Sequence, residues 1–130
     1  MSLLKCKELC FGYGTDFASP ANFELKGGEV VALMGRNGSG KSTLLKTLCG
    51  KINPTNGSVE IAGADLKTWS AIDLAKKIAY ISISKSAPER MTAREFVSLG
   101  RMPYSGIFDG RTTSDNEIVA EAIELLHLKD

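Results

Sequence analysis

The stretch GRNGSGKST (35–43) places three glycines, a lysine and hydroxyl residues directly after the apolar run VVALM (30–34). That run is apolar at every position, which is typical of a strand covered on both faces, as in a parallel sheet flanked by helices. Leucines at helical spacing follow the glycines as far as Gly50, which predicts a helix ending there. A buried strand, a glycine loop and a helix in this order predict an α/β fold.

The glycine stretch matches Gly-x-x-x-x-Gly-Lys-Ser/Thr, the P-loop pattern, at every constrained position. Glycine lets the backbone adopt positive φ and approach a phosphate, and the amides that follow form an anion-binding nest at the helix N-terminus. Lys41 is placed to reach between β and γ phosphates, Ser42 to ligate Mg²⁺, and Thr43 to support the α phosphate. The predicted phosphate-binding residues are Gly35, Arg36, Asn37, Gly38, Ser39, Gly40, Lys41, Ser42 and Thr43. The alternative is a glycine-rich turn with an incidental lysine.

Composition limits what kind of protein this is. The chain has 130 residues, 43% of them hydrophobic, and a net charge of +1, which predicts one packed domain. The near-neutral charge gives no support for nucleic-acid binding through bulk electrostatics. VVALM is far too short for a membrane span and no signal peptide precedes it, so we expect a cytoplasmic protein.

The cysteines and the histidine carry no metal pattern. Cys6, Cys10 and Cys49 are odd in number and unevenly spaced, so we interpret them as reduced, partly buried thiols. His127 stands alone in an apolar context, and we expect a structural or solvent-facing side chain.

Further strands and helices are predicted on either side of the loop. LLKCKELCFGYG (3–14) and ANFELKGGEVVALMG (21–35) suggest edge strands feeding the buried one. INPTNGSVEIAG (52–63) predicts a turn and an alternating strand, LKTWSAIDLAKK (66–77) a short helix, and IAYISI (78–83) a second apolar strand.

The last 40 residues predict two helices. AREFVSLG (93–100) follows Thr92 and should stop at Gly100. Ser114 and Glu117 suggest a capping box for a helix from Ser114 to Leu128. The expected apolar face of that helix is Ile118, Ala122, Ile123 and Leu126, and residues 102–114 between the two helices form a long loop candidate.

The motif and its neighbours resemble the nucleotide-binding subunit of ABC transporters along nearly the whole chain. GGEVVALMGRNGSGKSTLLKTLCGKINPTNGSVEIAGADL (27–66) is similar to that family's strand, P-loop, helix and following strand, and MTAREFVSLGRMPYSG (91–106) resembles the helical subdomain of importers for iron-siderophores, haem and vitamin B12. The resemblance implies a P-loop ABC-ATPase fold in part: an antiparallel β subdomain, the start of the parallel-sheet core and part of the helical subdomain.

An aromatic residue near the end of the first strand stacks on adenine in that family. Tyr13 matches it by position, so the resemblance implies that Tyr13 binds the base, whereas Phe11 lies on the strand pattern. The alternative for Tyr13 is a turn residue packed on the protein itself.

One position departs from the family. IAYISI resembles a family strand whose glutamine touches Mg²⁺ and the attacking water, and this chain has Ile83 there. A hydrocarbon side chain cannot ligate a cation, so the usual glutamine coupling is in doubt. Ser82, Ser84 or a water molecule are the remaining sources of an oxygen ligand.

The resemblance also implies what this chain lacks. The family's signature motif, its Walker B strand with the catalytic glutamate, and its switch histidine belong beyond Asp130. We therefore expect a partial ABC ATPase domain, with 1–85 as β subdomain and P-loop core and 86–130 as the start of the helical subdomain. No residue here is a credible general base, so no catalytic residue is predicted, and the chain alone should bind nucleotide without turnover and self-associate through uncovered apolar surface.

For the intact protein, the resemblance implies an ATPase that binds ATP and Mg²⁺ and drives import of an iron-siderophore, haem or cobalamin-type solute. Its implied partners are a membrane permease, a second ATPase copy and, indirectly, a substrate-binding protein, on the cytoplasmic face of the plasma membrane. The alternatives are an ABC ATPase of another route, such as an exporter, a lipid mover or a DNA-repair enzyme.

Overall fold

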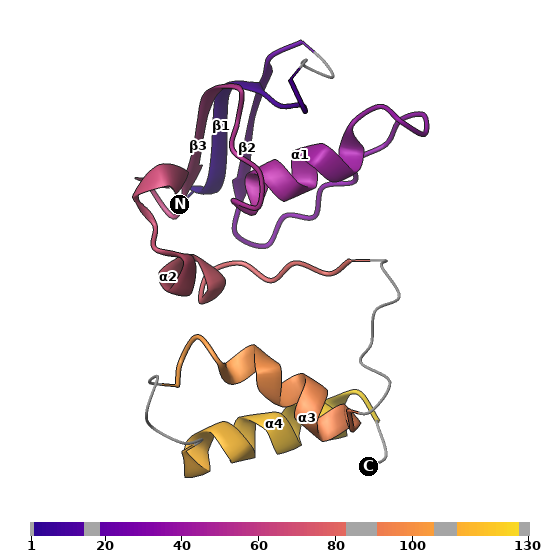
Figure 1. Cartoon of the computed structure of the whole chain (residues 1–130), viewed down its shortest axis with the longest axis vertical. Coiled ribbons are helices and arrows are strands. Elements are labelled where there is room, and N and C mark those ends of the chain that lie inside the picture. Colours follow the sequence, from indigo (N-terminus) through magenta and orange to yellow (C-terminus); the bar gives the residue numbers. More distant parts are fainter. Residues whose placement is uncertain (1, 15–18, 83–90, 106–111, 128–130) are drawn as a thin grey trace. The chain divides into compact units, whose positions relative to one another are not determined.

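The computed structural model describes residues 2–14, 19–82, 91–105 and 112–127 (Figure 1). The chain divides into two compact units, Met1–Ser70 and Ala71–Asp130. The predicted division into subdomains at residue 85 concerns the family's organisation and stays a prediction.

The first unit is built on a four-stranded antiparallel sheet with the order β2-β1-β3-β4. Its strands are β1 (Ser2–Cys10), β2 (Ala21–Lys26), β3 (Asn56–Ile61) and β4 (Ala64–Asp65), and the last leads into the 3₁₀ turn η1 (Leu66–Thr68). Strand β1 is central and pairs with β2 on one edge and β3 on the other. The strands predicted within 3–14, 21–35 and 52–63 are therefore present, but the prediction of an edge strand is wrong for β1, which has a partner on both sides.

The core of this unit lies where the sheet meets α1 (Lys41–Leu48), which Figure 1 shows beside β1, β2 and β3. Leu9 and Val59 from adjacent strands are almost completely buried, and Leu44 of α1 shares a pocket lining with Phe11 and Ala21. The buried side chains of α1 are Thr43, Leu44 and Thr47, so its buried face is only partly apolar. The buried hydrophobic residues of the unit are Cys6, Leu9, Cys10, Phe11, Leu44, Val59, Ile61 and Leu66.

Helix α1 ends as the sequence predicts. Its last residue is Leu48, and Gly50 adopts φ 69°. The N–H of Lys51 donates to the carbonyl of Lys46 at 2.9 Å, and that of Gly50 donates to Thr47 at 3.1 Å. This is the Schellman arrangement, in which glycine supplies the left-handed residue that closes the helix.

The strand predicted at Val30–Met34 is wrong for this structure. The segment forms no part of the sheet, and Val30, Val31 and Met34 are 98%, 67% and 87% exposed. The second predicted apolar strand is likewise absent from residues 78–82, where Ile81 is 94% exposed; Ile83 lies outside the described residues. A strand needs hydrogen bonds from a neighbour, and the described residues supply none for either segment.

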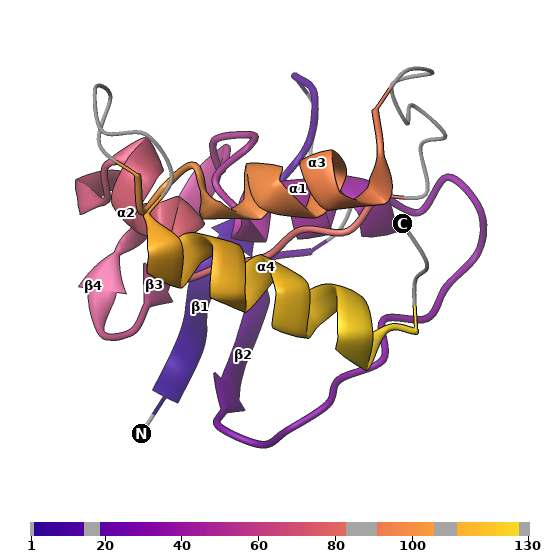
Figure 2. The ribbon, with the colours of Figure 1, turned by 90° about the horizontal axis from the view of Figure 1, so that it is seen from below.

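The second unit contains three short helical segments and one longer helix. These are α2 (Ala71–Ala75), α3 (Ala93–Ser98), the 3₁₀ turn η2 (Leu99–Arg101) and α4 (Thr113–Leu125). The one helix predicted over 66–77 is thus two short pieces, η1 and α2. Helices α3 and α4 lie side by side in both ribbon views (Figure 2).

Helix α3 begins after Thr92, as predicted, with a reciprocal capping box between Thr92 and Glu95. The predicted stop at Gly100 is wrong because η2 continues the helical chain through that residue to Arg101. After Ser98 the α-helix changes to a 3₁₀ turn, which is tighter and common at helix ends, and Gly100 lies within that turn.

The predicted start of α4 is also wrong. The capping box is formed by Thr112 and Asp115, two residues before the expected Ser114–Glu117 pair. Both pairs fit the same short pattern, and Asp115 has a second partner, Arg101, at 2.8 Å.

The apolar face of α4 is displaced from the predicted one. Val119 and Ile123 are buried, whereas Ile118 and Leu126 are 39% and 62% exposed. Only Ile123 of the predicted set therefore lies in the core.

Within the described ranges, no helix has the length and hydrophobicity needed to cross a bilayer.

Candidate functional site

The glycine loop connects the uncovered segment 30–34 to α1. Gly38 and Gly40 adopt φ 82° and 85°, the left-handed region that glycine occupies without steric cost. The N–H of Ser39 donates to the carbonyl of Arg36 at 3.2 Å, which closes a turn, and the N–H of Leu44 donates to Gly40 at 2.8 Å, which starts the helix. Two glycines thus turn the backbone directly into α1.

The N-terminus of α1 has no side-chain cap. Its N-cap residue is Gly40, which makes no side-chain hydrogen bond, and the first turn contains no acidic residue. The first amides of a helix have no partner inside it, and the helix dipole places partial positive charge there. This end of α1 is therefore suited to an anion.

Lys41 folds back over the loop that precedes it. Its Nζ donates to the carbonyl of Gly35 at 2.8 Å and to that of Arg36 at 2.7 Å. These two bonds fix the position of the ammonium group beside the start of the helix. An ammonium carries three donors, so one remains for a further acceptor.

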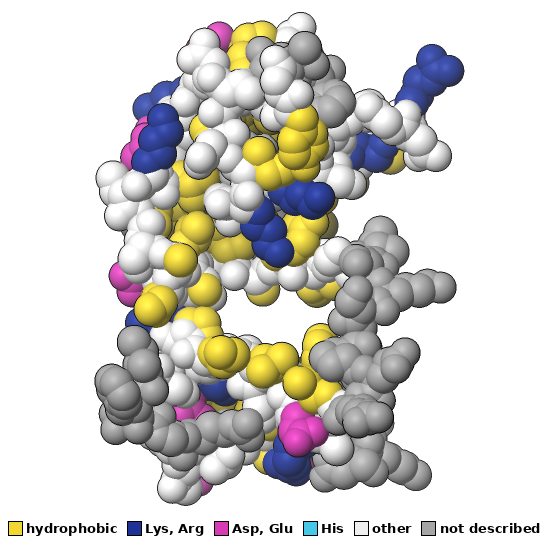
Figure 3. All heavy atoms as spheres, in the orientation of Figure 1, with side chains coloured by type: hydrophobic (Ala, Val, Ile, Leu, Met, Phe, Trp, Pro, Cys, Tyr) yellow, Lys and Arg dark blue, Asp and Glu magenta, His cyan; other side chains and the backbone are white. Residues whose placement is uncertain are grey.

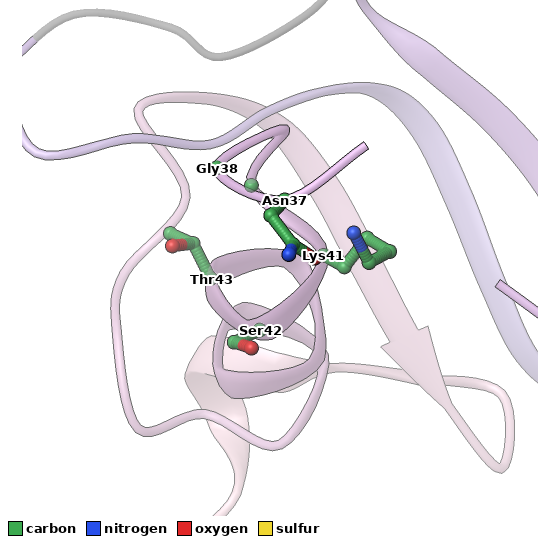
Figure 4. Close-up of a pocket in the computed structure, with 6 residues that line it drawn as sticks. Asn37, Gly38, Lys41, Ser42 and Thr43 are labelled. Carbon is green, nitrogen blue, oxygen red and sulfur yellow. The ribbon is translucent and has the colours of Figure 1, made fainter. Parts of the chain in front are cut away.

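These features line a pocket of about 380 Å³ (Figure 4). Figure 4 shows Asn37 and Lys41 at the start of the helix, with Ser42 and Thr43 projecting from its first turn. The lining consists of backbone from glycine, one amide, one ammonium and two hydroxyl side chains, and it contains no carboxylate. The lining residues are Asn37, Gly38, Gly40, Lys41, Ser42 and Thr43.

The structure brings six of the nine predicted loop residues to this pocket, and the other three have different roles. Gly35 and Arg36 contribute carbonyls that hold Lys41 rather than groups that face the pocket. Ser39 lines a second, neighbouring pocket. Sequence spacing identifies the loop but does not show which residues of it support the lysine.

Tyr13 does not line the pocket. Its side chain is 64% exposed, whereas Phe11, two residues earlier, is 5% exposed and belongs to the core. The ring of Tyr13 is thus exposed on the first unit, and that of Phe11 is buried.

A second pocket, of about 220 Å³, shares Lys41 with the first and is mainly apolar. Its walls come from the sheet, from the segment before the glycine loop and from α1. This pocket was not predicted from the sequence, because its residues are far apart in the chain. The lining residues are Phe11, Ser19, Ala21, Leu33, Met34, Ser39, Lys41 and Leu44.

The cysteines lie apart from the phosphate pocket. Cys6 and Cys10 are buried and Cys49 is half-buried, all three as free thiols. Burial raises the pKa of Cys6 to about 12 and also raises the pKa of Cys49, because a thiolate is poorly solvated there. Among the described residues, no three His, Cys, Asp or Glu side chains are grouped to hold a metal ion.

Comparison with known proteins places this geometry in a family. The sequence pattern described as "ABC transporter" matches residues 18–130. The chain belongs to the ABC transporter family. The match includes the glycine loop, α1 and all the helices of the second unit, so the fold class inferred from the motif is confirmed.

Several curated ABC relatives are ATP-binding proteins of iron and haem import. The chain is 39% identical to the hemin import ATP-binding protein HmuV of Nocardia farcinica over 78% of its length. It is 33% identical to the probable siderophore transport system ATP-binding protein YusV of Bacillus subtilis over 100% of its length, and 31% identical to the ferric enterobactin transport ATP-binding protein FepC of Escherichia coli over 98%. The chain spans 35%, 48% and 48% of those three relatives.

Solved ABC structures share the fold. A dimeric bacterial ABC transporter cassette superposes with a TM-score of 0.77 at 26% identity, over 98% of this chain and 58% of that one. The ATP-binding subunit of another ABC transporter gives a TM-score of 0.70 at 32% identity, over 86% and 45%. The chain is thus similar to about half of each solved subunit.

Proposed function

We propose that this chain forms the nucleotide-binding part of an ABC transporter ATPase and that the pocket at the start of α1 holds the phosphates of ATP. The observation that carries this proposal is the uncapped helix N-terminus beside the Lys41 ammonium, whose Nζ is held 2.7 and 2.8 Å from two loop carbonyls. Fixed donors and a fixed positive charge meet there, as binding of a polyphosphate requires.

The lining residues fit the parts of a magnesium nucleotide. The amides of the first turn would donate to phosphate oxygens, and Lys41 would add charge between the terminal phosphates. The Ser42 hydroxyl is exposed in the first turn and would ligate Mg²⁺, which prefers oxygen ligands. Thr43 lines the same pocket and would support the α phosphate.

Tyr13 is the proposed contact of the adenine base. Its exposed ring follows β1, in the same unit as the phosphate pocket. The core position of Phe11 supports Tyr13 rather than Phe11 as the stacking residue.

The proposed transport substrate is an iron-siderophore, haem or cobalamin-type compound. The names of the relatives support this class, since they include hemin, siderophore and ferric enterobactin systems. The proposed partners are a membrane permease, a second ATPase copy and, indirectly, a substrate-binding protein, on the cytoplasmic face of the plasma membrane.

Uptake in proteoliposomes tests this proposal. The intact protein, reconstituted with its cognate permease, should import labelled ferric siderophore, haem or cobalamin when ATP is supplied, and Lys41→Ala should abolish import. Export of a solute, or ATP-dependent movement of lipid by the same complex, would contradict the import proposal. It would not contradict the proposal that the pocket binds ATP.

For the 130-residue chain taken alone, we propose nucleotide binding without turnover. The six residues lining the pocket include no carboxylate or imidazole that could activate water. Release of phosphate from ATP should stay at the background rate in a malachite-green assay. A steady rate that Lys41→Ala removes would contradict this. Ile83 lies outside the described residues, so the doubt it raises about the usual glutamine coupling stays a prediction.

A further inference from the structure

We propose that Asn37 is a site of spontaneous deamidation, in which the neighbouring Gly38 converts its side-chain amide to a carboxylate and thereby lowers the affinity of the phosphate pocket for nucleotide. The chain contains two Asn-Gly pairs, 37–38 and 56–57, and the fold holds them differently. The conversion of Asn37 does not depend on the proposed function, whereas its effect on ATP rests on it.

Asn37 and Gly38 are the central residues of a tight turn. The N–H of Ser39 donates to the carbonyl of Arg36 at 3.2 Å, so the chain bends at the two residues between them, and Gly38 adopts φ 82°. A Cβ at Gly38 would meet no atom within 4 Å. Figure 4 shows both residues in the loop that precedes α1. Open space therefore surrounds the backbone of Gly38.

The reacting groups of this pair have no competing partner. Within the described residues, no hydrogen bond engages the Asn37 side chain or the Gly38 N–H. Glycine also offers the least steric resistance to ring closure, because it has no side chain. The bonds that shape this loop all lie within residues 35–44, so the state of the pair is local to the loop and the first turn of α1.

The sheet holds the second Asn-Gly pair. Asn56 pairs with Cys10 of β1, and the N–H of Gly57 donates to Oδ1 of Asn56 at 2.8 Å. Gly57 also lies so close to the carbonyl of Glu8 that no Cβ would fit there. Ring closure requires the backbone to rotate and the amide to lose its proton. A paired strand and a bonded N–H oppose both, so Asn56 reacts only when this part of the sheet opens.

The chemistry is an intramolecular acyl transfer followed by hydrolysis. The nitrogen of Gly38 bonds to Cγ of Asn37, the Cγ–Nδ2 bond breaks, and the amide proton of Gly38 leaves with Nδ2 as ammonia. Water then opens the cyclic imide at one of its two carbonyl carbons, which gives aspartate or isoaspartate. Nothing is oxidised or reduced, and asparagine is among the thermally labile residues. Either product carries a carboxylate where the chain had a neutral amide.

A carboxylate at residue 37 would oppose the binding of phosphates. Residues 30–59 contain four basic residues and no acidic one, and the pocket lining contains no carboxylate. In the view of Figure 3, the acidic side chains of the first unit lie at its edge. The new charge would lie at the positive end of α1, near the Lys41 ammonium, and would compete with phosphate for both.

Peptide mapping of the 130-residue chain tests the site. Trypsin cleaves after lysine and arginine, so Asn37 falls in the peptide 37–41 and Asn56 in the peptide 52–67. During incubation of the folded chain in mildly alkaline buffer, the mass gain from amide to acid should accumulate about tenfold faster at Asn37 than at Asn56. In urea, where the sheet no longer holds Asn56, the two rates should become similar. Equal rates in the folded chain, or faster conversion at Asn56, would overturn the proposal.

Calorimetric titration with MgATP tests the effect on the pocket. Asn37→Asp, which carries the aspartate product from the start, should bind about tenfold more weakly than freshly prepared wild type. Asn56→Asp is the matched control, because it makes the same charge change at the other pair and keeps the Oδ1 acceptor; its affinity should stay within about twofold of the wild type. Circular dichroism establishes that each variant is folded.

The two measurements separate this proposal from the proposed function. Affinity of Asn37→Asp equal to that of the wild type would overturn the effect of the modification. Absence of MgATP binding by the fresh wild type would instead contradict the proposed function, while faster conversion at Asn37 in the peptide map would still support the modification site.

Discussion

At the scale of single residues, glycine has two distinct uses in this molecule. In the phosphate loop, Gly38 and Gly40 turn the chain into α1 through positive φ. In β3, Gly57 makes room for another strand, because a Cβ there would lie 2.1 Å from the carbonyl oxygen of Glu8. Glu8 itself has φ 47° where β1 bulges, so the two strands can approach closely only at a glycine.

Gly57→Ala should therefore destabilise the first unit more than a glycine substitution in open space. Gly63 is the matched control, because it has φ 83° but nothing within 4 Å of the added methyl group. We expect Gly63→Ala to cost about 1 kcal/mol of backbone strain and Gly57→Ala about 3 kcal/mol, from urea denaturation curves. Equal losses of unfolding free energy in the two variants would show that β1 and β3 can move apart at Gly57 without loss of stability.

Tyr13 has a specific prediction of its own. If its exposed ring stacks on adenine, Tyr13→Ala should weaken ATP binding roughly 5- to 150-fold, while Tyr13→Phe should keep most of the affinity. Fluorescence titration with a nucleotide analogue measures both variants. Unchanged binding by Tyr13→Ala would favour the alternative, a turn tyrosine without a role in the site.

At the scale of elements, η2 and α4 are joined by one charged cluster. Arg101 of η2 donates from Nε to Asp115 of α4 at 2.8 Å, and its guanidinium lies 4.1 Å from the ring centre of Tyr104. Asp115 also accepts from the hydroxyl of Thr112 at 2.7 Å and is almost completely buried. The same carboxylate thus caps α4 and ties it to η2.

This cluster makes the second unit sensitive to acid. Hydrogen bonds from Thr112, and then from Arg101, hold the pKa of Asp115 below its ordinary value of about 4. A lowered folded-state pKa gives stability that is present above the unfolded-state pKa and is lost as the pH falls through the folded-state value. Protonation removes the carboxylate that Arg101 and the helix start share.

Urea denaturation between pH 6 and pH 2 tests whether the free energy of unfolding falls as the pH is lowered. The free energy of unfolding should fall below about pH 4 in the wild type and fall less in Asp115→Asn, which is less stable at neutral pH. Asp73→Asn is the control, since Asp73 pairs with Lys76 at 3.6 Å on the exposed surface of α2. A wild-type curve parallel to that of Asp115→Asn would exclude Asp115 as the source.

Local sequence predicts some elements and not others. The glycine loop and the end of α1 were predictable because each glycine determines its own backbone conformation, through φ at Gly40 and Gly50. The start of α4 was not, because two overlapping capping patterns compete and a distant residue, Arg101, distinguishes them. Val30–Met34 has the composition of a buried strand, but pairing depends on a neighbour that composition does not reveal.

At the scale of the whole molecule, the described chain is two compact units, and the phosphate pocket lies entirely in the first. The sequence predicted its chemistry because all six lining residues lie within one short stretch, 37–43. It could not predict the apolar pocket beside it, whose walls come from β2, the segment before the loop and α1. Family membership extends over both units, since the match covers residues 18–130.

The central claim is that the start of α1 binds the phosphates of ATP through Lys41. Isothermal titration of ATP with Mg²⁺ into the wild type, Lys41→Ala and Lys46→Ala tests it most directly, because Lys46 is in the same helix but does not line the pocket. We expect binding by the wild type, at least tenfold weaker binding by Lys41→Ala, and affinity within about twofold of the wild type for Lys46→Ala. Equal affinity of the wild type and Lys41→Ala would contradict the account.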